Sequence, residues 1–481
     1  VFANNMESDI VDPLLANTST PNQNHLSIGR LILITFLQLG INVVQNSSIV
    51  ITLPYEIKEL FPDKPALALG LLVATSSAFT ILNPIVGFYS DRCTSSWGRR
   101  KPFITLGSLF IILGVLGCWA SSSKVLSLAW PYAAAFIVMQ IGLIISNAGF
   151  NALMPDIVPV SQRGVASAIF GILGIIGSAL GYVAVGAALP LKKTSLSYLV
   201  MVATMLISAI FTLTGSKEIP LSHSQKQKLI NEAPDIKSAA KQMVAGLKYR
   251  DFTLVLVSRI LYFMSLAPQA YLLYLTDDLI NVSNAELAVT FLALSAQIAG
   301  LIVTFPTGKL CDKFGRKIFV YLATALNMIV YEVFIFSSSV YVFYVCGAIY
   351  GVSNGMYFTV ELALGMDCLP PEDVFIQKEE EQGYVIQANE TPTQRTEQDI
   401  SQSQSTAAGR NMGLWGIAQS LGQLLGMYLL GPLLQFVGST GDEDHYTRLG
   451  YGVIFTLGSL FALMSSGFVF FIKTSHKPPT K

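Results

Sequence analysis

The chain has 481 residues, of which 52% are hydrophobic and 12% charged, and its mean hydropathy is +0.55. A soluble domain carries about a quarter charged residues, so this composition excludes an ordinary soluble protein and indicates membrane spans. The formal net charge is zero, which gives no support to a nucleic-acid partner.

Twelve apolar stretches are long enough to cross a bilayer, whose core of about 30 Å requires about 20 helical residues. The sequence therefore predicts an all-α membrane protein with twelve transmembrane helices. We expect them near 31–53, 67–89, 102–121, 130–153, 164–188, 197–215, 252–275, 286–308, 318–337, 341–365, 411–436 and 450–472.

These spans divide the chain into two six-helix bundles, 31–215 and 252–472. A polar tail, 1–30, precedes them and lacks the apolar core of a cleavable signal peptide. A linker, 216–251, carries a short amphipathic pattern near 235–249 that predicts a helix on the membrane surface. An insert, 371–408, is rich in Gln, Glu, Thr and Ser and is predicted to be disordered, because it offers little to bury. Residues 473–481 form a second tail.

Basic residues favour the cytoplasmic side of short loops. If the N-terminus lies inside, most Lys and Arg fall on cytoplasmic segments, so both termini are predicted to be cytoplasmic. The sequon Asn281-Val282-Ser283 then lies outside, where glycosylation is possible.

An internal repeat relates the two bundles. The string GFYSDR at 87–92, followed by GRRK at 98–101, recurs as GKLCDK at 308–313, followed by GRK at 315–317. Residues 152–159 and 363–370 form a second matching pair. Duplication of a six-helix unit is typical of transporters.

These loops resemble the signature of the major facilitator superfamily. The longer string SDRCTSSWGRRKP at 90–102 resembles plant sucrose transporters and their relatives in the glycoside-pentoside-hexuronide:cation symporter group. Residues Arg250–Phe252 with Arg259, 351–370 and 409–419 are similar to microbial members of that group. The resemblance implies two pseudo-symmetric six-helix bundles, a cavity lined by helices 1, 4, 7 and 10, and symport of a sugar by alternating access.

Charged residues near the repeated loops are candidates for gating. Asp91 and Asp312 lie at helix ends beside bases, so we expect weak ion pairs that join the halves in one state and break in another. Alternatively, the bases only obey the orientation rule. The candidate gating residues are Asp91, Arg92, Gly98, Arg99, Arg100, Asp156, Arg163, Asp312, Gly315, Arg316, Lys317, Asp367 and Arg410.

Polar side chains on one face of a membrane helix indicate a solute path, because lipid contact would be costly. Amides and aromatic rings suit the hydroxyls and apolar face of a sugar. Hydrogen bonding between helices uses the same residue types and stays an alternative. The candidate binding residues are Gln38, Asn42, Gln45, Asn46, Gln140, Asn147, Asn151, Tyr262, Gln269, Asn354, Tyr357, Trp415 and Gln419.

Energy coupling needs a group that changes charge inside the membrane. Arg259 and Glu361 are each expected about 10 Å from the cytoplasmic end of their helices, where they could meet. Our hypothesis is that Glu361 binds the transported proton when Arg259 is drawn away. The alternative is a permanent buried ion pair. Asp156 is a rival coupling residue, because it resembles an aspartate of plant sucrose transporters; we favour gating for it.

The sequence gives no enzymatic signature. Its four histidines fall in tails or loops, and neither a phosphate-binding loop nor a metal motif is present, so we expect no enzyme, no metal and no cofactor, with an ion gradient, H⁺ rather than Na⁺, as the energy source. A facilitator or exporter of a non-sugar solute, or a sensor that signals through 371–408, stays open. We expect a monomer whose partners are a small solute, protons and lipid. The plasma membrane is favoured over a vacuolar or lysosomal membrane.

Overall fold

The computed structural model describes residues 25–191, 193–218, 246–280, 282–368, 397–439 and 445–473, with side chains from Leu414 onward in the fifth stretch. Within these residues the secondary structure is helical, apart from one isolated bridge between Ser439 and Tyr446. Eleven helical segments are long and apolar enough to cross a membrane. α16, Val340–Asp367, is the twelfth long helix. The predicted all-α membrane fold is confirmed.

The first half contains six spans. The first runs over Ile28–Leu60 as α1 (Ile28–Thr35), α2 (Leu37–Ser47), a π-helical turn (Ser48–Thr52) and α3 (Leu53–Leu60). The second consists of α4 (Pro65–Thr80) and α5 (Asn83–Asp91). Then follow α6 (Lys101–Ser121), α7 (Ala129–Ile157), α8 (Arg163–Ala188) and α9 (Thr194–Gly215).

The second half begins with a span over Arg250–Ile280, made of α12 (Arg250–Ser265), a 3₁₀ turn (Ala267–Tyr271), α13 (Leu272–Leu275) and a π-helical turn (Thr276–Ile280). It continues with α14 (Ala285–Phe314), α15 (Arg316–Phe336), α16, α18 (Glu397–Gly438) and α19 (Arg448–Phe470). Proline stands in the first turn of α4, α5 and α6, where its missing N–H costs no helical hydrogen bond.

Two expectations for the polar segments meet the structure only in part. Residues 219–245 and Asn281 lie outside the described residues, so most of the amphipathic pattern and the sequon are untested. Residues 246–248 form a short 3₁₀ turn. α18 begins at Glu397, so residues 397–408 of the insert are helical rather than disordered, because they continue the last-but-one span. Residues 371–396 lie outside the description.

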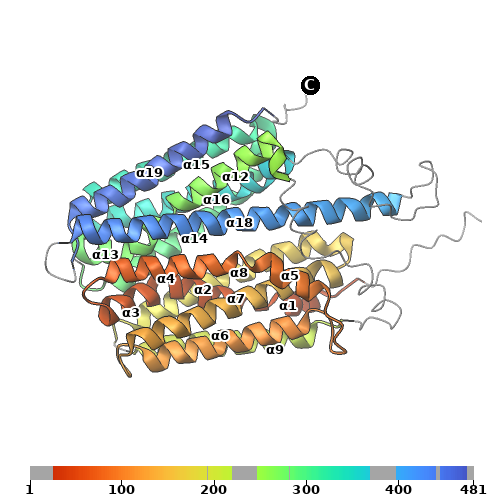
Figure 1. The fold of residues 1–481 in the computed structure, drawn as a ribbon, viewed down its shortest axis with the longest axis horizontal. Helices are drawn as coiled ribbons and strands as arrows, with labels where there is room; N and C mark the ends of the chain where they lie inside the picture. Colours follow the sequence, from red (N-terminus) through yellow and green to blue (C-terminus); the bar gives the residue numbers. More distant parts are fainter. Residues whose placement is uncertain are drawn as a thin grey trace, which may run out of the picture.

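The two halves form adjacent layers with their helices running along the same long direction (Figure 1). α4 of the first half packs against α18 of the second half. We call the end that carries Arg99, Arg100, Arg316 and Lys317 the basic end, and the end that carries Leu60 and Leu275 the opposite end.

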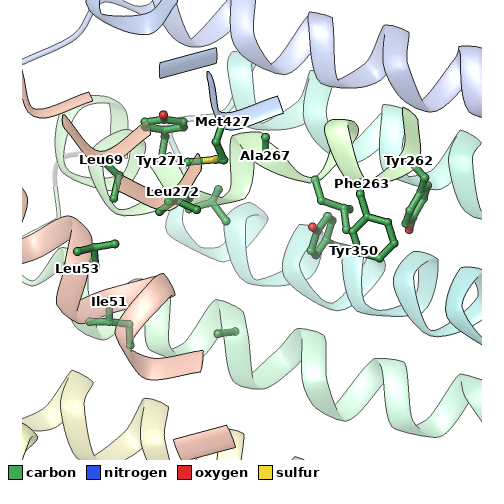
Figure 2. Packing of buried hydrophobic residues seen from close by; sticks show 14 of the residues in the cluster. Ile51, Leu53, Leu69, Tyr262, Phe263, Ala267, Tyr271, Leu272, Tyr350 and Met427 are labelled. Atoms are coloured by element: carbon green, nitrogen blue, oxygen red, sulfur yellow. The ribbon is translucent and has the colours of Figure 1, made fainter. Parts of the chain in front are cut away.

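The halves pack closely toward the opposite end. Gly70 of α4 faces Gly431 of α18 so tightly that a Cβ atom on Gly70 would come within 2.9 Å of the Cα atom of Gly431. Leu69, Tyr271 and Met427, which come from both halves, lie together in the buried core (Figure 2). Only small residues permit this approach of α4 and α18.

Candidate transport site

A cavity of about 300 Å³ lies between the halves. Its wall comes from the first, second, fourth, seventh and eleventh spans. The polar lining residues are Gln45, Ser76, Ser77, Thr80, Asn83, Gln140, Asn147, Asn151, Gln269, Gln419, Ser420 and Gln423, and the apolar ones include Ile49, Leu143, Phe263 and Met427. All 22 lining residues within the described part of the chain are uncharged, so the cavity suits a neutral polar solute.

Six of the predicted binding residues lie on this wall: Gln45, Gln140, Asn147, Asn151, Gln269 and Gln419. The sequence analysis missed the hydroxyls of α4. Ser76 and Thr80 stand four residues apart in an apolar helix, which places them on one helical face and is a signal that could have identified them.

The other amides of the first span contact a neighbouring helix instead. Asn46 Nδ2 donates to Ser178 Oγ of α8 at 2.8 Å and to Asn42 Oδ1 at 3.0 Å. Gln38 and Asn42 both pack beside Gly174 of α8. For Asn42 and Asn46 the alternative of interhelical hydrogen bonding describes this structure, because small residues on α8 allow α2 to approach. Gln38 packs against α8, but its Oε1 is buried without a hydrogen-bond partner among the described residues.

α16 contributes no residue to the cavity wall among the described residues, contrary to the expectation for the tenth helix. Asn354 Oδ1 accepts a hydrogen bond of 2.8 Å from the Tyr262 hydroxyl, and the Tyr262 and Tyr357 rings stack. A Cβ atom on Gly355 would come within 3.0 Å of the Cα atom of Gly300 in α14. This close packing draws α16 toward α14 and leaves Tyr262, Asn354 and Tyr357 in the core of the second half.

Arg259 and Glu361 meet as predicted, directly behind the cavity wall. Their side chains form a buried ion pair, 7% and 6% exposed. Arg259 Nε donates to the Trp415 carbonyl at 2.9 Å, and Nη2 donates to Gln419 Oε1 at 2.8 Å. The guanidinium also lies over the Trp415 ring, 4.5 Å from its centroid. Trp415 therefore supports Arg259 and is not on the wall.

At the basic end of the first half, Arg100 lies between two carboxylates. Its Nη1 is 2.6 Å from Asp91 Oδ1, and its Nε is 2.8 Å from Asp156 Oδ2. Arg99 Nη2 also binds Asp156 Oδ2 at 2.8 Å. Burial lowers the pKa of Arg100, but the hydrogen bonds and charges of Asp156 and Asp91 outweigh burial and raise that pKa. Arg100 is therefore a permanent cation.

The second half repeats this arrangement. Arg316 lies 2.5 Å from Asp367 and 3.9 Å from Asp312, as Arg100 does between Asp156 and Asp91. Gly98 and Gly315 occupy matching turns with φ of 122° and 91°, a region that favours glycine. The structure thus displays the repeat that the sequence indicated.

The remaining candidate gating residues lie in different surroundings from these clusters. Arg92 lies over the Phe88 ring, Arg163 begins α8, and Lys317 Nζ donates to the Ile472 carbonyl. The side chain of Arg410 lies outside the described residues. As far as the described residues go, Asp91, Asp156, Asp312 and Asp367 do not form the expected pairs between halves, because the ion pairs of each lie within one half.

Glu218, which the sequence analysis did not select, caps α6. Its carboxylate accepts the backbone N–H groups of Arg100 at 2.9 Å and Lys101 at 3.2 Å. A carboxylate stabilises the positive end of a helix dipole, so Glu218 fixes the start of the central linker against the basic loop.

The sequence analysis also missed the bonds that join the halves toward the opposite end. Lys58 Nζ binds Asp277 Oδ2 at 2.5 Å. The Tyr274 hydroxyl donates to the Pro54 carbonyl at 3.0 Å, and the Ala66 N–H donates to the Tyr446 hydroxyl at 2.9 Å. These residues lack a repeat or a shared helical face, so no sequence pattern marks them.

Comparisons with known proteins agree with the architecture described above. The model of the Major Facilitator Superfamily matches residues 35–374. The chain belongs to the major facilitator superfamily. This superfamily member is similar in fold to the solved nucleoside transporter NupG, with a TM-score of 0.63 and 12% identity; the match covers 93% of this chain and 99% of NupG. The xylose transporter XylE from E. coli gives a TM-score of 0.62 at 13% identity, with 94% and 99% covered. At these identities the likeness shows the fold.

Sequence relatives of this superfamily member include sucrose transport proteins. SUC3 of Arabidopsis thaliana is 28% identical over an alignment of 187 residues, and the alignment covers 32% of this chain and 31% of the relative. SUT1 of Oryza sativa is 27% identical over an alignment of 227 residues, which covers 40% of this chain and 42% of the relative. The matched region thus spans less than half the length of these curated relatives.

Proposed function

We propose that this transporter carries a sugar together with a proton by alternating access. The observation that carries the proposal is the uncharged cavity of amides and hydroxyls with a buried ion pair directly behind its wall. The partial similarity to sucrose transport proteins supports a sugar as the solute.

The cavity chemistry favours a neutral polyol over an ion. Gln45, Gln140 and Asn147 each offer a donor and an acceptor, which is what a hydroxyl-rich solute needs. Gln269 adds the donors of its Nε2, because its Oε1 accepts the Tyr350 hydroxyl at 2.8 Å. An organic anion would have to give up its hydration without a cation on the wall, which costs far more than burial of a hydroxyl. Phe263 adds a ring that can contact the apolar face of a sugar.

Glu361 is the proposed proton carrier. Its carboxylate is buried and paired with Arg259, so a change in that pair changes its affinity for a proton. Asp156 binds Arg99 and Arg100 at the basic end, which supports a gating role for it rather than coupling.

The gating proposal follows from where the halves are joined. The Lys58–Asp277 pair and the tyrosine hydrogen bonds join them toward the opposite end, whereas each cluster at the basic end closes within its own half. These contacts support the proposal that this is a state closed toward the opposite end. By the orientation rule the basic end faces the cytoplasm, so we propose cytoplasmic termini. As separate proposals, the protein is a monomer and its location is the plasma membrane.

Purified protein in liposomes tests the proposal. We expect an imposed inward proton gradient to drive accumulation of one sugar from a panel, with competition by related sugars. Glu361→Gln should abolish uphill uptake while exchange of labelled sugar across the membrane continues. Saturable flux that ignores the proton gradient, or uphill uptake by Glu361→Gln, contradicts the coupling. Deletion of 371–396 should leave flux intact; loss of a cellular signal with normal flux would favour a sensor.

A further inference from the structure

Gln419 is in contact with both functional elements of the site. It lines the cavity, and its Oε1 accepts a hydrogen bond of 2.8 Å from Arg259 Nη2. The other described donors of Arg259 go to Glu361 and to the Trp415 carbonyl. Phe263, also on the wall, contacts the guanidinium through its ring face, 4.9 Å from the ring centroid. Gln419 is thus the lining residue that reaches the buried ion pair through a hydrogen bond.

The bond from Arg259 fixes which way the Gln419 amide points. A glutamine side chain has an acceptor at Oε1 and two donors at Nε2 on the other side of the same carbon. With Oε1 turned toward Arg259, Nε2 is directed away from the guanidinium and can donate to a solute hydroxyl. Without that bond the amide can rotate, and the donor position is no longer fixed.

The strength of this bond depends on the charge of Glu361. While Glu361 is ionised, the Arg259 guanidinium is shared between the carboxylate and Gln419. Once Glu361 takes up a proton, the carboxylate no longer competes for the guanidinium, and Arg259 bonds more strongly to Gln419. Protonation therefore fixes the amide in the orientation that binds solute.

The surroundings of Glu361 leave Arg259 as its dominant charged neighbour. Tyr262 on α12 and Tyr357 on its own helix are the nearby titratable groups. α18 presents the neutral Trp415 and Gln419. From α19, the neutral hydroxyl of Ser465 lies near Tyr357 and forms a hydrogen bond with the hydroxyl of Ser258.

We propose that Gln419 couples the two ligands: solute bound to Gln419 raises the affinity of Glu361 for the proton, and the proton raises the affinity for solute, through Arg259. The two effects must be equal, because coupling between binding sites is reciprocal. This inference rests on the proposed proton-coupled transport, and it names the residue that links the two events.

The experiment measures binding of one labelled sugar, the one that the liposome panel selects, to the purified full-length transporter in detergent, without a gradient, at about pH 6 and about pH 8. For the unsubstituted protein we expect about tenfold tighter binding at the lower pH. Gln419→Ala should bind more weakly and show less than about a twofold change with pH. Gln423→Ala is the matched control, because Gln423 lines the same cavity one helical turn away; it should bind more weakly but keep the full pH dependence.

The outcomes separate the inference from the proposed function. If the unsubstituted protein binds solute equally at both pH values, the proton coupling fails and the inference with it. If the unsubstituted protein responds to pH and Gln419→Ala responds equally, the inference is wrong while proton coupling stands. Gln419→Met, which keeps the length of the side chain, replaces Gln419→Ala if the alanine variant does not fold, and the same outcomes apply.

Discussion

The Arg259–Glu361 pair gives a stability prediction that depends on burial alone. Both side chains are at most 7% exposed, so neither charge reaches bulk water when its partner is removed. Removal of one member of a buried pair costs about 3–5 kcal/mol, whereas replacement of both by apolar residues of similar volume is often neutral. We therefore expect the double variant Arg259→Met/Glu361→Met to be more stable than the Arg259→Met variant.

The two single variants should also differ from each other. Without Glu361, Arg259 still donates to the Trp415 carbonyl and to Gln419 and still lies over the Trp415 ring. Without Arg259, Glu361 loses the hydrogen-bond partner that the structure gives it. Glu361→Met should thus lose less stability than Arg259→Met.

Thermal unfolding of purified protein in detergent at about pH 8, where an unpaired carboxylate is least easily protonated, measures these differences. The four proteins form a double-mutant cycle, which isolates the interaction energy of the pair. If the two single losses simply add in the double variant, Arg259 and Glu361 do not interact in the folded protein and the described geometry is incorrect.

Three further substitutions test other parts of the structure. Glu218→Ala removes the cap of α6 and should cost about 1 kcal/mol, seen as a lower unfolding temperature, whereas Glu218→Asp should recover part of it. Gly70→Leu should force α4 away from Gly431 and open the opposite end, so that a membrane-impermeant reagent labels a cysteine placed at Ser76; unchanged labelling contradicts the closure. Lys58→Ala should change stability by no more than about 1 kcal/mol, because its partner Asp277 is 43% exposed.

The sequence predicted the spans well because hydropathy acts over about 20 residues and does not depend on neighbours. The sequence was less successful at predicting which amide side chains face the cavity and which face a neighbouring helix. Gln45 and Asn46 are adjacent in the first span, yet Gln45 lines the cavity and Asn46 bonds to Ser178. A rotation of about 100° separates them, and which neighbour each meets depends on small residues of α8 that no local pattern connects to α2.

The charged residues show the same limit. The repeat identified Asp91, Arg100, Asp312 and Arg316 as equivalent, and the structure gives them equivalent partners. The repeat did not identify the half in which the partner of each residue lies. That depends on how the two bundles are arranged in a given conformational state, which a sequence pattern does not contain. The role of Glu218 was not predicted, because a single acid shortly after α9 carries no periodic signal and α6, which it caps, is distant in the sequence.

The tyrosine hydrogen bonds near the opposite end are chemically one-sided, unlike the Lys58–Asp277 pair beside them. In these bonds Tyr271, Tyr274 and Tyr446 of the second half supply hydroxyl groups, whereas the first half supplies main-chain atoms of Pro54 and Ala66. A main-chain carbonyl persists whatever side chain is attached to it, so mutation of Pro54 or Ala66 leaves that carbonyl in place. The strength of these tyrosine hydrogen bonds can therefore be adjusted residue by residue mainly from the second half. Substitutions in that half are the way to change the balance between states that are closed and open toward the opposite end.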